Sequence, residues 1–405
     1  MSGPLAGIRV FDLSRILAGP TATQILGDLG ADVIKIERPG AGDDTRKWGP
    51  PFVKDAAGKD THESGYYLSI NRNKRSVTLD VSKPEGQEIA KRLIARADIF
   101  VENFKVGDMA RYSLSYDQIK YDFPRLIYCS ITGFGQTGPY APLAGYDFLA
   151  QGMGGIMSVT GDPNGQPTKV GVAITDIVCG IYSTVAILAA LHHRTISGRG
   201  QFCDMSLLDS QVGYLANVGL HYLTSGELPK RLGNEHPNIV PYSVVRCSDG
   251  FFILAVGNDS QFEKFCGFAG VPDWATDERF ATNPARVRNR VLIYQMINAL
   301  TEQKPQQYWI DGLNALGVPV GPVNNIDQVF KDPQVLAREM KISMPHAAAG
   351  SGHVDLIGSP IKLSETPVDY RLAPPVCGQD TDDVLRELLS MEDGEIAGLR
   401  ARKII

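Results

Sequence analysis

The stretch over residues 171–194, GVAITDIVCGIYSTVAILAALHHR, most constrains what this chain can fold into. Residues 177–191 are apolar on nearly every face, which is typical of a helix buried in a protein core. Residues 169–174 are apolar and β-branched, so we expect a strand that leads into this helix. Ser183 and Thr184 interrupt the apolar run and basic residues end it, so we do not expect it to cross a membrane. The rest of the chain must therefore build a core around it.

Asp176 stands at the expected junction between this strand and this helix. One interpretation is an N-cap, because Thr175 or Asp176 could accept hydrogen bonds from the first free backbone N–H groups of the helix. The other is a carboxylate nucleophile, which the helix start would keep ionised and which the small residues Gly171 and Ala173 would leave open to a substrate. The local sequence leaves both interpretations open.

The first half of the chain alternates between strand and helix patterns. Residues 8–13 and 31–37 are predicted strands that enclose a short helix ending near Leu29, and such a βαβ unit has parallel strands. The pattern continues with predicted strands over 76–81, 97–102, 126–131 and 201–207, and a helix over 84–96. The alternation predicts an α/β fold with a Rossmann-like, mostly parallel sheet covered by helices.

Glu37 ends the second predicted strand, where an acid could hold a ribose hydroxyl in a dinucleotide-binding domain. Residues 12–20, DLSRILAGP, contain only one glycine where that motif needs G-x-G-x-x-G for the pyrophosphate to approach the backbone. The sequence therefore argues against an NAD-dependent dehydrogenase.

Basic residues gather near the predicted strand ends and in the loops after them. An isolated arginine is usually a solvated surface charge. Open α/β sheets bind ligands at the carboxyl ends of their strands, however, and the planar guanidinium suits phosphate. Several basic residues at one sheet edge therefore favour a phosphorylated ligand. These residues are Arg38, Lys74, Arg75, Lys105 and Arg111.

The pattern changes near residue 225, where a turn-rich loop precedes a predicted hairpin at Asp249 and Gly250. We predict a large α/β domain over residues 1–224, a small α+β domain over 225–325, and completion of the large domain by 326–405. The connection over residues 38–69 is long enough to suggest a functional loop.

The composition is that of an ordinary soluble protein, with 43% hydrophobic and 21% charged residues. A net charge of -5 gives no reason to expect a nucleic-acid partner. The six cysteines are scattered without a CxxC pair, which predicts reduced core residues and neither disulfides nor a metal site. The N-terminus resembles neither a signal segment nor an Arg-rich leader, so we expect a cytoplasmic protein without a membrane partner.

Several blocks in the same order strongly resemble the family III CoA-transferases, the formyl-CoA transferase and carnitine-CoA transferase family. The blocks are IRVFDLSRILAGP, GADVIKIERPGAGDDTR, NRNKRSVTLD, ADIFVENFKVGDMAR, GYDFLAQGMGG, GVAITDIVCGIYSTVAILAALHHR and SGRGQFCDMSLLD. The resemblance covers nearly the whole chain. It implies an interlocked homodimer that moves CoA from an acyl-CoA donor, such as succinyl-CoA, to a small carboxylic acid, with acyl-CoA as substrate and no permanently bound cofactor.

The resemblance also assigns roles to residues. Asp176 matches the family's nucleophile, and Asp147 with Tyr146 matches a position beside the thioester. Residues that match the CoA groove are Ala18, Arg38, Leu79, Asp80, Val81, Ser82, Asn103, Phe104, Lys105 and Arg111. Leu17, in the same groove, stands where formyl-CoA transferase has a glutamine, which puts formate and oxalate in doubt as substrates.

A second segment, Gly233, Asn234, Glu235 and His236, takes the place of the glycine-rich loop that covers the intermediate in this family. His236 could also serve the second carboxylate of a dicarboxylic substrate, although a loop histidine is more often an ordinary hydrogen-bonding residue. Backbone N–H groups near Gly154 and Gly155, or at Gly233, could stabilise an oxyanion.

The same family contains α-methylacyl-CoA racemases, which move a proton with a His and Asp pair in a GHD motif. The corresponding block here is Gly145-Tyr146-Asp147, so the imidazole is missing, and a tyrosine with a pKa of ~10 is a poor base at neutral pH. The residues favour a transferase over a racemase or a non-catalytic CoA-binding protein. We expect Asp176 to form an anhydride with the acyl group, then a thioester with CoA, which the incoming acid resolves.

Overall fold

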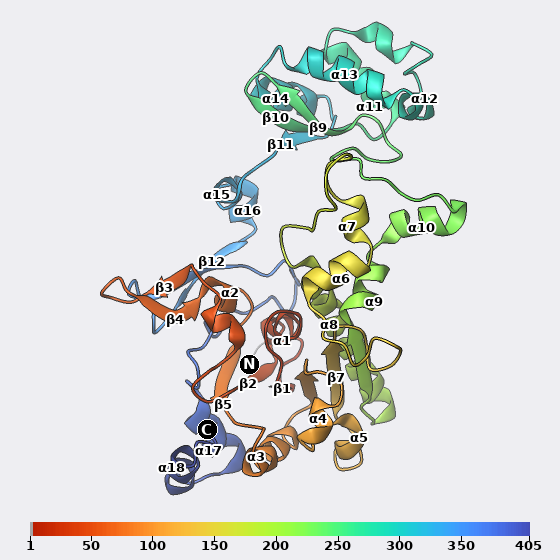
Figure 1. Ribbon diagram of the computed structural model, residues 1–405. Helices are drawn as coiled ribbons and strands as arrows, with labels where there is room; N and C mark the ends of the chain where they lie inside the picture. The colour runs from red at the N-terminus through yellow and green to blue at the C-terminus, as the bar shows by residue number, and fades with distance from the viewer. Residues whose placement is uncertain (1–2) are drawn as a thin grey trace. The chain divides into compact units, whose positions relative to one another are not determined.

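The computed structural model describes residues 3–405 and forms two compact units (Figure 1). The first unit contains residues up to 156, 170–224 and 333–405, and the second contains 157–169 and 225–332. These bounds differ from the predicted ones because residues 157–169 and 326–332 also belong to the second unit. The Arg231 guanidinium ties residues 157–169 there by donating to the carbonyl oxygens of Ser158, Asp162 and Gly165.

A six-stranded parallel sheet forms the centre of the first unit. Its order is β5-β2-β1-β6-β7-β8, so the chain fills one half outward from β1 and the other outward from β6. The strands are β1 (Arg9–Asp12), β2 (Asp32–Glu37), β5 (Lys74–Thr78), β6 (Ile99–Glu102), β7 (Ile127–Thr132) and β8 (Phe202–Ser206). This order confirms the predicted Rossmann-like sheet, and it places a topological switch point between β1 and β6.

Hydrophobic clusters cover both faces of this sheet, because successive side chains of a strand point to opposite faces. Phe11 and Ile34 belong to one cluster, whereas Val10 and Val33 belong to the other. The first cluster also contains residues of α3 (Pro84–Ile94), α17 (Thr381–Leu389) and α18 (Asp393–Ala401). The second contains residues of α1 (Ala18–Asp28) and α8 (Ile174–Ser197).

The apolar stretch that opened the sequence analysis forms α8, a single helix of 24 residues. The strand predicted over residues 169–174 is wrong, because Ile174 already belongs to the helix and the N–H of Val170 donates to the side chain of Gln151. By length and composition alone α8 could cross a membrane, and half of its most apolar window is buried inside the structure. Its buried residues, such as Ile187 and Ala190, make it a core helix of this α/β unit.

Two basic residues lie at the other edge of the sheet from the one predicted. Lys74 and Arg75 begin β5, so they lie at its amino end. Arg75 pairs with Asp32 and Glu387, and the ammonium group of Lys74 is buried against Asp12. Residues 79–81, which were predicted to continue this strand, instead follow it at the carboxyl edge.

Shorter elements complete the first unit, and they show that the long loop over residues 38–69 contains a hairpin and a helix. The elements are η1 (Asp44–Lys47), β3 (Phe52–Lys54), β4 (Asp60–Ser64), α2 (Gly65–Leu68), α4 (Asp108–Arg111), α5 (Tyr116–Ile119), α6 (Asp147–Met153), α9 (Leu207–Gly213), α16 (Pro333–Ala337), β12 (Lys341–Pro345) and β13 (His353–Ile357). Two helices, α7 (Ile156–Val159) and α10 (Ala216–Ser225), span the divisions between units.

The second unit has an antiparallel sheet of order β11-β10-β9 and its own core, as expected of an α+β domain. The hairpin predicted at Asp249 and Gly250 is confirmed, with Gly250 paired to Cys247. The elements are β9 (Tyr242–Cys247), β10 (Gly250–Ala255), α11 (Asp259–Phe268), η2 (Pro272–Ala275), α12 (Asn283–Arg288), α13 (Arg290–Thr301), α14 (Gln306–Ala315), β11 (Val320–Pro322) and α15 (Ile326–Val329).

Candidate active site

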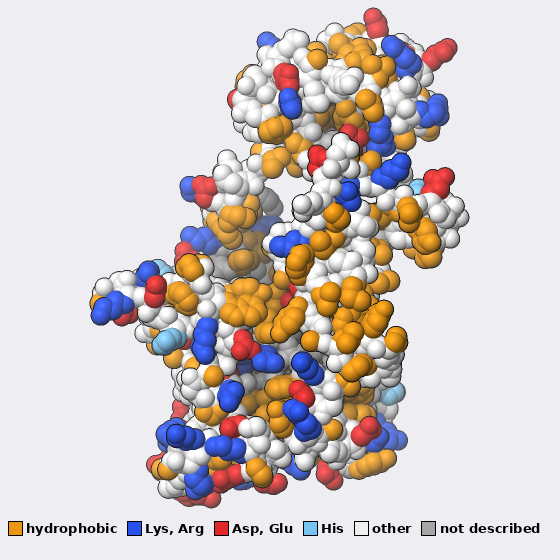
Figure 2. Space-filling model, in the orientation of Figure 1, with side chains coloured by type: hydrophobic (Ala, Val, Ile, Leu, Met, Phe, Trp, Pro, Cys, Tyr) orange, Lys and Arg blue, Asp and Glu red, His pale blue; other side chains and the backbone are white. Residues whose placement is uncertain are grey.

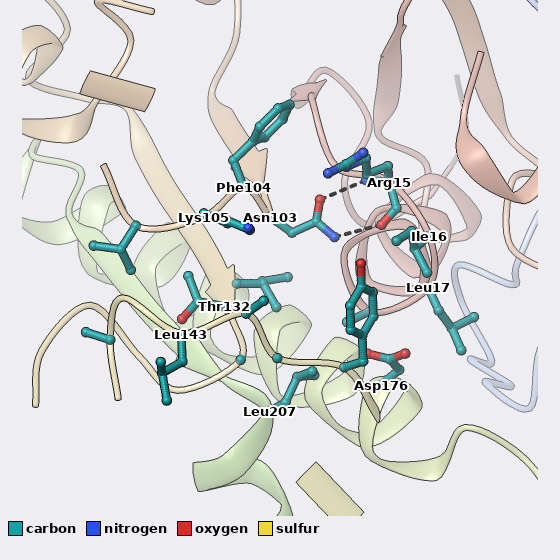
Figure 3. Close-up of a pocket in the computed structure, with 18 residues that line it drawn as sticks. Arg15, Ile16, Leu17, Asn103, Phe104, Lys105, Thr132, Leu143, Asp176 and Leu207 are labelled. Carbon is teal, nitrogen blue, oxygen red and sulfur yellow. Dashed lines mark hydrogen bonds between the residues drawn. The ribbon is translucent and has the colours of Figure 1, made fainter. Parts of the chain in front are cut away.

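An inner cleft opens at the switch point, between the loop after β1 and the loop after β6 (Figure 3). Open α/β sheets bind their ligands at this place, because neighbouring loops diverge there. Of the residues predicted to act in binding or catalysis, seven line the inner cleft: Leu17, Ala18, Asn103, Phe104, Lys105, Tyr146 and Asp176. The predicted nucleophile therefore faces a cavity at the carboxyl edge of the sheet.

An outer hollow adjoins the inner cleft and shares Arg15 and Phe104 with it. Five more of the predicted residues line this hollow: Arg38, Leu79, Asp80, Val81 and Ser82. Arg111 lines neither space. Its guanidinium lies 3.0 Å from the carboxylate of Asp108, which itself lines the outer hollow. The two spaces together form a groove that runs from the loop after β5 to Asp176.

Asp176 lies in the first turn of α8 and is half-buried. One interpretation expected Thr175 or Asp176 to cap the helix, but neither side chain does so. Instead Asp147 of α6 accepts hydrogen bonds from the backbone N–H groups of Thr175, at 2.8 Å, and Asp176, at 3.3 Å. Burial and this neighbouring carboxylate raise the pKa of Asp176 to about 7. Burial and Asp147 therefore oppose the ionised form of Asp176 that the helix start was expected to favour.

Tyr146 lines the inner cleft, whereas Asp147 does not. The second oxygen of Asp147 accepts from the side-chain amide of Gln151 at 2.7 Å, which directs the carboxylate to the start of α8. Tyr146 precedes α6 and is 63% exposed beside the cleft. The predicted pair thus divides into one residue that supports the first turn of α8 and one that is open to a ligand.

A close approach of two helices places Asp176 beside the loop after β1. A Cβ atom at Gly180 would lie 2.6 Å from the carbonyl oxygen of Ala18, so α8 passes α1 at a distance that only glycine permits. Gly180 is one turn after Asp176, and Ala18 is the first residue of α1. The contact therefore brings the first turn of α8 to the wall that contains Leu17.

The loop after β1 is held in an unusual conformation. Ile16 has φ of 71°, in the left-handed region that a β-branched residue rarely adopts. Asn103 fixes the preceding residue by accepting from the backbone N–H of Arg15 at 2.9 Å and donating to its carbonyl oxygen at 2.7 Å (Figure 3). Asp43 accepts from the N–H of Ile16 at 3.3 Å. The family-matched residue Asn103 thus shapes the groove wall.

Asp43 is itself buried in an ion pair with Lys35 at 2.8 Å, and both side chains are almost inaccessible. The ammonium group of Lys35 also donates to the carbonyl oxygen of Ser14. Burial alone would raise the pKa of Asp43, but Lys35 and the hydrogen bonds from Thr45 hold it below its usual value. This ion pair therefore holds the loop after β1 as long as Asp43 and Lys35 both stay charged.

The backbone N–H groups predicted as oxyanion donors already donate hydrogen bonds to backbone carbonyl oxygens. The N–H of Gly154 donates to Ala150, that of Gly155 to Gly152, and that of Gly233 to Gly161. By contrast, α1 has no side-chain cap at its start, where Leu17 and Ala18 line the inner cleft. The first amides of α1 are therefore better placed to receive a negative oxygen.

The predicted covering loop lies in the second unit, where it is tied to α13. Arg290 donates to the carboxylate of Glu235 and to the carbonyl oxygens of His236 and Pro237. Nδ1 of His236 accepts from the N–H of Asn238. The role of Gly233, Asn234, Glu235 and His236 in covering an intermediate stays a prediction.

Sequence reasoning missed several residues of the cleft. Arg15 and Ile16 belong to the loop after the first predicted strand, so the sheet-edge rule could have found them. Tyr66, which lines neither the inner cleft nor the outer hollow, also gave no signal in the sequence. Burial, together with Asp176 and Asp147, raises the pKa of its phenol to about 12, so it is a neutral neighbour of the two acids. Within residues 3–405, no cluster of three or more His, Cys, Asp or Glu side chains could hold a metal ion.

Known proteins resemble this chain over nearly its full length. It is 50% identical to a succinate–glutarate CoA-transferase of Agrobacterium fabrum over 96% of both chains. It is 41% identical to the human succinyl-CoA:glutarate CoA-transferase, covering 99% of this chain and 90% of that protein. The crystal structure of a CAIB/BAIF family protein from Brucella suis matches with a TM-score of 0.85 and 47% identity, over 96% of this chain and all of the other.

The model of the family described as CoA-transferase family III matches residues 5–381. The match spans the whole sheet of the first unit and all of the second unit. An acyl-CoA thioester is the substrate of such an enzyme, in agreement with a groove that ends at a carboxylate. The chain belongs to CoA-transferase family III and is a CoA-transferase.

Proposed function

We propose that this enzyme transfers CoA from succinyl-CoA to a small dicarboxylic acid such as glutarate, with Asp176 as the nucleophile. The observation that carries the proposal is the position of the Asp176 carboxylate, at the inner end of a groove on the carboxyl edge of the sheet. The substrate pair follows the names of the similar enzymes from Agrobacterium fabrum and human.

A carboxylate suits this reaction because it needs no general base when it is ionised. Asp176 attacks the thioester carbon, the C–S bond breaks, and the product is an aspartyl–succinyl anhydride with free CoA thiolate. The thiolate then attacks the aspartyl carbonyl, which releases succinate and leaves an aspartyl-CoA thioester. The acceptor acid repeats the two exchanges in reverse. The activated acyl bond is conserved at each step, so no other energy source is required.

Different parts of the CoA molecule bind in the outer hollow and in the inner cleft. Arg38 and residues 79–82 line the outer hollow, where a guanidinium and backbone groups suit the phosphorylated adenosine end. The pantetheine arm passes Arg15 and Phe104, which both spaces share, and brings the thioester to Asp176. The uncapped start of α1, at Leu17 and Ala18, then stabilises the oxyanion.

Water has to be kept from the anhydride, since hydrolysis would waste it. We assign this task to Gly233, Asn234, Glu235 and His236, as the family resemblance implies. Gly233 has φ of 60°, which fits a turn at the tip of such a loop. His236 is the candidate for the second carboxylate of a dicarboxylic acid.

A homodimer in the cytoplasm completes the proposal. Apolar side chains are exposed along α6, α8 and α9, and Figure 2 shows hydrophobic side chains gathered over these elements. They include Phe148, Leu149, Ile181, Tyr182, Val185, Val212 and Tyr214. A monomer rarely exposes such a contiguous apolar surface, and a second copy of the chain would cover it.

A screen of acceptors tests the substrate assignment. Purified enzyme would be incubated with succinyl-CoA and a panel of mono- and dicarboxylic acids, and the acyl-CoA products identified by mass. We expect new acyl-CoA with glutarate and other short dicarboxylic acids, and none with the Asp176→Ala variant. Transfer to monocarboxylic acids alone would contradict the substrate class, and full activity of Asp176→Ala would contradict the nucleophile.

A further inference from the structure

Asp147 is held more firmly than capping a helix requires. Its Oδ1 accepts from the N–H groups of Thr175 and Asp176, and its Oδ2 accepts from Nε2 of Gln151. Gln151 is fully buried, and its own oxygen accepts from the N–H of Val170 at 2.9 Å, which sets the direction of its amide. Asp147 therefore cannot turn away from the first turn of α8.

The residue that precedes α8 offers no cap, because Ala173 has no side-chain acceptor. A serine or asparagine at that place would suffice for capping. Instead the chain supplies a carboxylate from another helix and places it against the backbone N–H of Asp176 itself. Within residues 3–405, neither acid forms an ion pair with a lysine or arginine. Two like charges are thus brought together in a half-buried place.

Resting on the proposed function, we propose that Asp147 is a positioning residue that favours acylation of Asp176. It fixes the first turn of α8, and its negative charge favours transfer of the Asp176 charge to the departing CoA thiolate. When the oxygen of Asp176 bonds to the acyl carbon and the C–S bond breaks, the electron pair leaves with sulfur. The like-charge contact is relieved in the anhydride and again in the aspartyl-CoA thioester.

Among Asp176, Tyr66 and Cys179, only Asp176 has a pKa near neutral pH. Burial, together with the charges of Asp176 and Asp147, raises the pKa of Tyr66 in α2 to about 12. Cys179, one turn along α8, has a pKa raised to about 11. Arg15 and Lys105 line the same cleft, and Arg15 lies 2.8 Å from Asp44. Burial and Asp147 are the causes that raise the pKa of Asp176 to about 7.

The test separates charge from capping. Asp147→Asn removes the charge but turns an amide donor toward Nε2 of Gln151. The double variant Asp147→Asn/Gln151→Glu restores that hydrogen bond, keeps an acceptor for Val170, and moves the charge one side chain farther from Asp176. Asp209→Asn is the control, because Asp209 is an exposed acid on α9 that does not bond to α8.

Two readouts are needed in each variant. The first is the pH dependence of kcat/KM with succinyl-CoA, and the second is the fraction of enzyme labelled at Asp176 after trapping, measured by mass. For the double variant we expect the acid limb to move to lower pH, because the like charge beside Asp176 is moved away while the burial of Asp176 is unchanged. We also expect the labelled fraction to fall several-fold, with no change in Asp209→Asn.

An equal loss of activity at all pH values, with the acid limb in place, would overturn the proposal in favour of a purely structural cap. Failure of both Asp147 variants to fold would overturn it in the same way. The proposed function fails separately, if wild-type enzyme carries no label on Asp176.

Discussion

Two groups of buried acids lie in the first unit, and they are built in opposite ways. Asp12, Glu37 and Asp43 lie against Lys74, Arg46 and Lys35, so each carboxylate has a cation beside it. Asp147 and Asp176 lie against each other. Burial would raise the pKa of Asp12, Glu37, Asp43 and Asp176. The cations reverse that effect for the first three acids, whereas Asp147 adds to it for Asp176.

The difference teaches where chemistry is possible. A paired buried carboxylate is held by its cation and is not available to attack a substrate. Asp176 has no cation beside it and faces a cleft, and its charge can be relieved by forming a covalent bond. The paired group lies under the loop after β1 and holds the wall of the groove, whereas the unpaired one ends the groove.

Among the substitutions that test the difference between the two groups of acids, we expect the largest effect at Asp176. Asp176→Asn keeps the size of the side chain but removes the proposed nucleophile, and we expect the rate of CoA transfer to fall by at least about a thousandfold. Steady-state kinetics with succinyl-CoA measure the loss. Binding of CoA by calorimetry serves as the control and should change little. Retention of a substantial rate would show that another group carries the acyl intermediate.

The paired group should respond in stability. Asp43→Asn leaves the ammonium of Lys35 buried without its partner, which costs about 3–5 kcal/mol in the free energy of unfolding. Asp44→Asn is the matched control, because Asp44 pairs with Arg15 where both side chains are half exposed, and such a pair contributes at most about 1 kcal/mol. Urea denaturation compares the two variants. Equal losses would contradict the structural role of the buried pair.

The position of Asp176 depends on how closely α8 packs against α1. Gly180→Ala would force α8 away from α1, because the added Cβ would meet the Ala18 carbonyl oxygen, and we expect kcat to fall by about 10–100-fold. Gly213→Ala in α9 adds the same methyl group in open space and should leave kcat within about twofold. Similar rates for both variants would mean that the close approach of α1 and α8 does not set the position of Asp176.

The two groups should also differ in how pH affects stability. The pKa of Asp176 is raised from 3.8 to about 7, so its ionisation opposes folding, and the penalty grows between these values and is complete above pH 7. Asp176→Asn should therefore stabilise the protein at pH 8 relative to pH 4, by about 2 kcal/mol or less. The lowered pKa of Asp43 works in the other direction, because its contribution is lost as the pH falls below 3.8.

Thermal unfolding of wild type and Asp176→Asn across this pH range provides the measurement. A constant difference between the two proteins from pH 4 to pH 8 would show that Asp176 ionises as freely in the folded chain as in the unfolded chain.

The alternation of strands and helices could be predicted because each strand of the parallel sheet is a short apolar run between turns. The strand expected over residues 169–174 failed for a local reason. Its β-branched residues suit a strand, but no neighbouring strand pairs with them, and Asp147 accepts the first amides of α8 from a distance of 28 residues in the sequence. A cap supplied by another helix leaves no local pattern.

The site was predicted to a similar extent. Family resemblance placed Arg38, Leu79 and Asn103 in the groove, and the structure brings them to its walls. The burial of Lys35 and Lys74 could not be predicted, because a lysine is usually exposed and only its tertiary partners decide otherwise. The raised pKa of Asp176 could not be predicted either, because it results from burial and from Asp147, which the sequence does not place beside it.

Mass spectrometry of the enzyme trapped during turnover tests the central claim most directly. With succinyl-CoA and hydroxylamine or borohydride as the trapping reagent, the account predicts a modified peptide that carries the change at Asp176 and is absent from Asp176→Asn. Label on another acid, or turnover with no labelled peptide at any time, would contradict the account.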